Sequence, residues 1–295
     1  MSSPVSPDPD VSTPFLKERI RSLFRQVPKG LAGNEEAIHQ MRVAGRRLRV
    51  ALPLVARKPG GKRVRRALRV LGELTRAAGT SRDLDVISGL LSQELSGSHP
   101  PNAEARQLRQ RLLSARRRSR VRMAESLLDL EIARLRRDLR AIVKRRGEDL
   151  FTGLSRLYRL REEEGDGLLA AIAAVGGRFD PEGLHDLRKR ARRLRYAAEV
   201  SAALRGSPAS VSDIFRELQG QLGTIHDAHV LSGWLGLQAE RNERAGQAAL
   251  AAEARRLADL FVGRSLAAHQ ALLESGLAET AEGALAAMGR TRSAA

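Results

Sequence analysis

The chain of 295 residues contains no cysteine. This absence excludes disulfide scaffolds, cysteine-ligated zinc or iron–sulfur sites, and cysteine nucleophiles. No stretch approaches the roughly 18 uninterrupted apolar residues of a membrane-spanning helix. The opening residues, MSSPVSPDPDVSTP, also lack the charged-then-apolar pattern of a signal peptide. We therefore expect a soluble, cytoplasmic protein that does not associate with membranes.

Aromatic side chains and lysine are scarce as well. The aromatic set is six Phe, two Tyr and one Trp, whereas Lys and Arg together number 52 and the formal net charge is +18. Nearly all of these cations are arginine, whose planar fork matches phosphate oxygens, so the excess favours a polyanionic partner. Proteins that hold single-stranded nucleic acid usually stack bases on aromatic rings. For nucleic acid, the composition therefore predicts only non-specific attraction at low salt.

Helix-forming residues dominate the rest of the composition and predict an all-α protein of roughly ten helices. Asn34 and Asp180 have the residue types and context of helix N-caps, and Pro181 suits the first helical position. Glycine-containing segments predict breaks at 59–61, 79–80 and 206–208. Residues 1–14 are expected to form a disordered arm and residues 289–295 a frayed tail.

An internal repeat divides the chain. Residues 38–51 read IHQMRVAGRRLRVA and residues 184–197 read LHDLRKRARRLRYA, at an offset of 146. Further along, GTSRDLDVI (79–87) matches GTIHDAHVL (223–231) at an offset of 144. Two ordered matches at nearly one offset predict a duplicated helical unit, with repeats at about 15–150 and 151–288 that pack about a pseudo-twofold axis.

The repeated segment carries a cationic stripe. On a helical wheel His39, Arg42, Arg46 and Arg49 fall within an arc of about 80°, opposite the apolar side chains. The second copy places His185, Arg188, Arg192 and Arg195 in the same way. Like charges at this spacing repel each other, and neither stripe contains an acid. A bound polyanion would relieve the repulsion, and phosphate nearby would raise the pKa of the histidine.

The paired motif HxxRxxxRRLRxA, each copy followed by a Gly-Thr-x-x-Asp segment, resembles the CHAD domain, a family named for its conserved histidine and α-helical fold. The resemblance covers residues 15–288. It implies two pseudo-symmetric four-helix bundles with a basic surface and central pore that bind inorganic polyphosphate. The binding set carried over by motif is His39, Arg42, Arg46, Arg49, His185, Arg188, Arg192 and Arg195, with Arg47, Lys189 and Arg193 at its edge.

The resemblance also implies a binder without catalysis or cofactor. The ExExK signature of the triphosphatase domain that often accompanies CHAD domains is absent, so a standalone polyphosphate-binding protein is expected. Association with polyphosphate granules is one role that this leaves open. The charge is uneven between the copies, with a net of +17 over residues 1–150 and +1 over residues 151–295.

Several positions around the motifs have two interpretations. Lys62, Arg66 and Arg69 share one helical face that either widens the binding surface or is simply solvated. Asp83 and Asp227 either hold the motif arginines or lie at helix N-termini, where the helix dipole favours an acid. Gly45 and Pro53 are expected to kink or shorten the first repeated helix.

Two other functions compete with polyphosphate binding. His185-Asp186, His226-Asp227 and the nearby His229 suggest a metal-dependent phosphohydrolase of the HD type. The equivalent positions in the first copy, His39-Gln40 and Arg82-Asp83, do not repeat that ligand set. The second alternative is a helical protein that binds nucleic acid without sequence specificity.

Overall fold

The computed structural model describes residues 12–97, 100–144 and 150–289, and the described residues form ten helices and no strand. The first five helices are α1 (Ser12–Leu31), α2 (Glu35–Val55), α3 (Lys62–Glu94), α4 (Ala103–Leu128) and α5 (Ile132–Lys144). The other five are α6 (Leu150–Val175), α7 (Pro181–Arg205), α8 (Ser210–Arg244), α9 (Ala248–Glu274) and α10 (Leu277–Gly289). The all-α prediction is confirmed.

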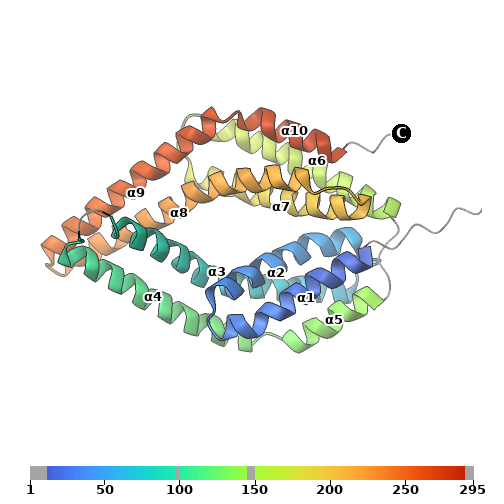
Figure 1. Cartoon of the computed structure of the whole chain (residues 1–295), viewed down its shortest axis with the longest axis horizontal. Coiled ribbons are helices and arrows are strands. Elements are labelled where there is room, and N and C mark those ends of the chain that lie inside the picture. The colour runs from blue at the N-terminus through green and yellow to red at the C-terminus, as the bar shows by residue number, and fades with distance from the viewer. Residues whose placement is uncertain (1–11, 98–99, 145–149, 290–295) are drawn as a thin grey trace, which may run out of the picture.

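The helices form two halves that lie against each other. In Figure 1, α1–α5 occupy the lower half of the view and α6–α10 the upper half. Most consecutive helices pack together, but α5 packs against α3 and α1 instead of α4. The halves meet where α2 contacts α6 and α7, α3 contacts α8, and α4 contacts α9. Each half contains five helices within the described residues, one more than the four expected for each bundle.

Two apolar cores hold the helices together. The larger core includes residues of both halves, among them Leu48 of α2 and Leu194 of α7, each fully buried. The second core lies where α3, α4, α8 and α9 converge, at the left of Figure 1, and is centred on residues such as Leu91, Leu108, Leu235 and Phe261. Both cores therefore join the first half of the chain to the second.

The predicted helix starts agree with the structure. The Asn34 side chain accepts a hydrogen bond from the Ala37 amide at 2.8 Å, and the Asp180 side chain accepts one from the Glu182 amide at 3.0 Å. The break at 206–208 is also present, because Gly206 ends α7 with a φ of 59°. The last three residues of the predicted N-terminal arm, 12–14, belong instead to α1. Residues 1–11 and 290–295 lie outside the described part.

The predicted break at Gly79–Thr80 is wrong. α3 runs without interruption from Lys62 to Glu94, and α8 passes through the equivalent Gly223–Thr224. Gly45 does not interrupt α2 either. A Cβ at Gly45 would lie 2.8 Å from a methyl group of Thr75, so this glycine allows α2 and α3 to approach closely. α2 ends at Val55, two residues after Pro53.

None of the described helices is both long enough and apolar enough to cross a membrane.

Candidate polyanion site between the two halves

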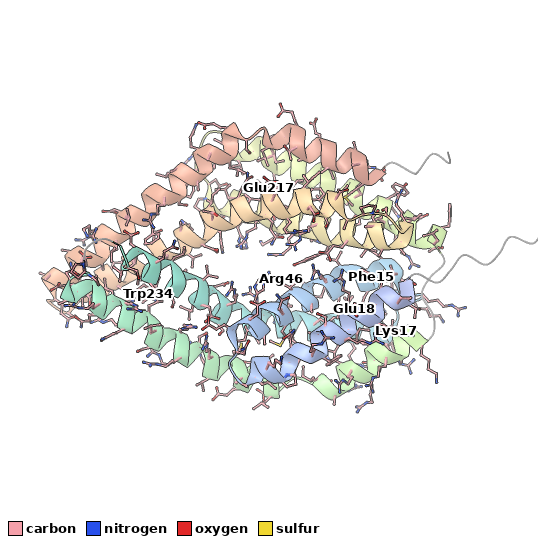
Figure 2. The ribbon with its side chains drawn as sticks, viewed as in Figure 1. Phe15, Lys17, Glu18, Arg46, Glu217 and Trp234 are labelled. Atoms are coloured by element: carbon pink, nitrogen blue, oxygen red, sulfur yellow. The ribbon has the colours of Figure 1, made fainter. Side chains whose placement is uncertain are left out.

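The two repeated helices, α2 and α7, contact each other across the boundary between the halves. Each helix buries its apolar face in the larger core, with Met41 and Leu187 fully buried. Because side chains on one helix share faces at intervals of three and four residues, the opposite faces present the two His/Arg stripes. Figure 2 shows Arg46 of α2 between the lower and the upper half.

The arginines at the centre of the stripes are close enough to repel one another. Burial, followed by repulsion from Arg192 and Arg42, lowers the pKa of Arg46 to about 9. Burial also lowers the pKa of Arg192, and Arg188 and Arg42 lower it further. Arg42 is only 8% exposed. Four guanidinium groups, two from each half, thus share one partly desolvated region.

Carboxylates from α3 and α8 contact Arg42 and Arg188, the first arginine of each stripe. Arg42 donates hydrogen bonds to the Gly79 carbonyl at 3.0 Å and to Asp83 Oδ1 at 3.3 Å. In the second half, Arg188 Nη2 lies 4.0 Å from Asp227 Oδ1. Both acids lie inside long helices, so the interpretation as helix N-terminal residues is wrong. Of the two alternatives, the structure supports the one in which they hold the motif arginines.

The motif histidines lie near equivalent positions that carry different side chains in the two copies, Arg82 in the first and His226 in the second. Burial lowers the pKa of His39, and the nearby Arg82 lowers it further. His226, which replaces Arg82 in the second copy, lies beside His185 with the ring centroids 5.3 Å apart. Burial and the charge of Arg188 lower the pKa of His226 to about 4. The pKa of His185 is lowered by burial and by Lys189.

A cavity of about 490 Å³, which we call the central cavity, lies between α2, α6 and α7 beside the two stripes. Its lining includes the predicted residues Arg46, Arg49, Arg192, Lys189 and Arg193. Glu164 of α6 also lines it and forms an ion pair with Arg193. The structure therefore brings five of the predicted cations to one cavity.

Arg47 and Arg195, by contrast, bind a buried acid. Glu199 of α7 is 9% exposed, and its Oε1 accepts a hydrogen bond from Arg47 at 2.8 Å. Arg19 of α1 lies 3.3 Å from its Oε2, and Arg195 lies 3.9 Å from its Oε1. Arg195 also donates a hydrogen bond to Gln219 at 3.1 Å. Arg19 and Arg47 therefore connect the first half to the second through a carboxylate of α7.

Lys62, Arg66 and Arg69 do not line the central cavity. Arg66 donates two hydrogen bonds of 2.5 Å to Asp138 of α5. Lys62 and Arg66 line a separate cavity of about 690 Å³ near the α2–α3 connection. Arg69 is exposed. For Arg66, the contacts indicate a structural connection between α3 and α5.

Sequence reasoning missed the acids around which the arginines gather. Glu199 and Glu164 stand outside the repeated positions, and apart from Arg195 the residues that bind them come from other helices. Asp85 is 6% exposed and accepts hydrogen bonds from Arg116 at 2.6 Å and Arg120 at 3.0 Å. For the arginines that bind Asp85, the sequence did contain a signal: Arg116 and Arg120 are four residues apart and therefore share a helical face.

The fold and site define an all-helical protein with an arginine-rich site between its two halves. The CHAD domain family model matches residues 15–236, and the chain belongs to this family. The crystal structure of the CHAD domain from the plant Ricinus communis matches with a TM-score of 0.63 at 22% identity, over 97% of this chain and 95% of that one. That likeness concerns the fold.

Two curated relatives come from Mycobacterium tuberculosis, the uncharacterized protein MT2285 of strain CDC 1551 / Oshkosh and the uncharacterized protein Rv2226 of strain ATCC 25618 / H37Rv. Each is 31% identical over 222 residues, which is 72% of this chain and 42% of the relative. The chain thus spans less than half the length of the curated relatives it matches.

Proposed function

We propose that the protein binds inorganic polyphosphate between its two halves and does so without catalysis. The observation that carries this proposal is the group of four mutually repelling arginines, Arg42, Arg46, Arg188 and Arg192, whose charges are partly removed from water. A polyanion would offset this repulsion with charge-assisted hydrogen bonds. Membership of the CHAD family, which is associated with polyphosphate binding, supports the same ligand class.

The dimensions favour a chain of phosphates over a single one. Each stripe spans ten residues, about 15 Å of helix axis, and cations from both helices line the neighbouring cavity. Several consecutive phosphates can therefore contact both helices at once. The net charge of +17 over residues 1–150 would attract such a ligand from a distance.

The hydrolase alternative has less support. Asp186 accepts a hydrogen bond from Arg190 at 2.8 Å, and Asp227 faces Arg188, so the acids of both His-Asp pairs face arginines. In the described part of the chain, no group of three or more His, Asp or Glu side chains is arranged to hold a metal ion. The side chains present do not fit the site that this alternative needs.

Selectivity against nucleic acid tests the second alternative. Tyr196 is the one aromatic residue in the lining of the central cavity. The guanidinium carbons of Arg47 and Arg195 lie 5.8 and 5.6 Å from the centroid of its ring. Little aromatic surface remains for bases. We expect polyphosphate to stay bound at physiological salt when duplex DNA or RNA is added in excess, as measured by equilibrium competition. Displacement by either nucleic acid would contradict the proposal.

Binding is expected to tighten as the pH falls from 8 to 6. The pKa values of His39 and His185 are lowered in the free protein, so these side chains are neutral at pH 8. A bound polyanion raises both pKa values, and the complex takes up protons that the free protein does not hold. Affinity titrations at the two pH values measure this effect.

The double variant His39→Gln/His185→Gln is the control for the pH effect. Its affinity is expected to vary less between pH 8 and pH 6 than that of the unmodified protein. A flat profile for the unmodified protein would remove the histidines from the mechanism.

A further inference from the structure

A second cavity, outside the polyphosphate site, lies between α4 and α8. Its volume is about 410 Å³, within the range of small-molecule sites. The lining combines the chain's one tryptophan, Trp234, with three arginines and several amide side chains. Figure 2 shows Trp234 near the left end of the molecule, where the two halves converge, and Arg46 nearer the middle.

The charges that line this cavity are all positive. Arg111, Arg118 and Arg241 contribute to the lining, and no carboxylate among the described residues does. Arg111 is held by hydrogen bonds to Asn242 at 2.7 Å and Gln247 at 3.2 Å. Arg118 and Arg241 are exposed, and no carboxylate among the described residues lines the cavity beside them. Their guanidinium groups are therefore free to bind an anionic group.

The remaining lining suits a flat, polar ring. Trp234 packs against the second core and also lines the cavity, so its indole is held in place by packing. Gln238, which is 6% exposed, lies one helical turn further along α8, and Gln110 faces the cavity from α4. An indole can stack on a nucleobase, and amide side chains can pair with the donor and acceptor groups of its edge.

We propose that this cavity binds a mononucleotide, with the base stacked on Trp234 and the phosphates held by Arg118 and Arg241. Phosphate recognition alone would not need the tryptophan, and a purely apolar ligand would not need the arginines. The combination of both specifies a ring and an anion within one small molecule. This site is independent of the polyphosphate proposal, because none of its lining residues belongs to the His/Arg stripes.

Trp234 provides its own probe, since no other tryptophan contributes to the fluorescence. We expect ATP to quench that fluorescence saturably at about 150 mM salt, with free tryptophan as the control for absorption by the nucleotide. Tripolyphosphate, which has the charge but not the base, is expected to quench little. Arg118→Gln and Arg241→Gln are each expected to weaken ATP binding by about tenfold, as for loss of a charge-assisted hydrogen bond.

Arg117→Gln is the matched control, because Arg117 is an exposed arginine of α4 that does not line the cavity. It should leave ATP affinity unchanged, as should Arg46→Gln/Arg192→Gln in the polyphosphate site. Three results would overturn the inference: no saturable quenching at millimolar ATP, equal quenching by tripolyphosphate, or much tighter binding of a single-stranded oligonucleotide than of ATP. The polyphosphate proposal would survive each of them.

Discussion

The double variant Arg46→Gln/Arg192→Gln is expected to lose polyphosphate affinity by at least about 100-fold and to unfold at a higher temperature than the unmodified protein. Each substitution removes charge-assisted hydrogen bonds to the ligand, worth about 1.5–3 kcal/mol apiece. In the free protein the same substitutions remove repulsion between two partly buried cations. Calorimetric titration with polyphosphate of defined length and a thermal unfolding curve measure the two effects.

Opposite effects on binding and stability distinguish a ligand site from a structural one. The control Arg122→Gln/Arg137→Gln changes the net charge equally but alters exposed side chains, so affinity should change by no more than a few-fold. Adding Arg42→Gln and Arg188→Gln to the first variant should abolish the remaining binding. Unchanged affinity in the double variant, or a lower unfolding temperature, would contradict the assignment of these arginines to the site.

Glu199→Gln is expected to produce the largest loss of stability. The substitution removes the carboxylate that neutralises Arg19, Arg47 and Arg195 and leaves three partly buried cations together. Breaking a buried ion pair by removing one partner typically costs about 3–5 kcal/mol of unfolding free energy. Urea denaturation measures this loss.

The control for this prediction is Glu217→Gln, which removes an exposed carboxylate of α8. Its unfolding free energy should lie within about 0.5 kcal/mol of the unmodified value. A loss below about 1 kcal/mol for Glu199→Gln would show that the arginine cluster contributes little to holding the halves together. Polyphosphate affinity of the folded Glu199→Gln variant is not expected to fall, because Glu199 adds only negative charge beside the stripe.

Local chemistry explains which features could be predicted from the sequence. Asn34 and Asp180 mark helix starts because a capping side chain acts on an amide two or three residues away. The stripes of α2 and α7 were predictable for a similar reason, since helical periodicity alone places His39 beside Arg42 and Arg46.

Features that depend on tertiary contacts could not be predicted in this way. Glycine inside a helix costs only about 1 kcal/mol relative to alanine, and packing in the two cores outweighs that cost at Gly79 and Gly223. The contacts of Glu199 with other helices could not be predicted either, because Arg47 is separated from it by 152 residues. A stripe identifies which arginines point the same way, but not which of them an acid from another helix will bind.

The second core has a consequence for how the chain folds. Its members come from α3 and α4 of the first half and from α8 and α9 of the second, as with Leu91 and Phe261. A fragment that ended after α5 would expose to water the apolar surface that α3 and α4 contribute to the second core. Despite the repeated sequence, we therefore expect a single cooperative unfolding transition, and either half expressed alone to self-associate through that surface.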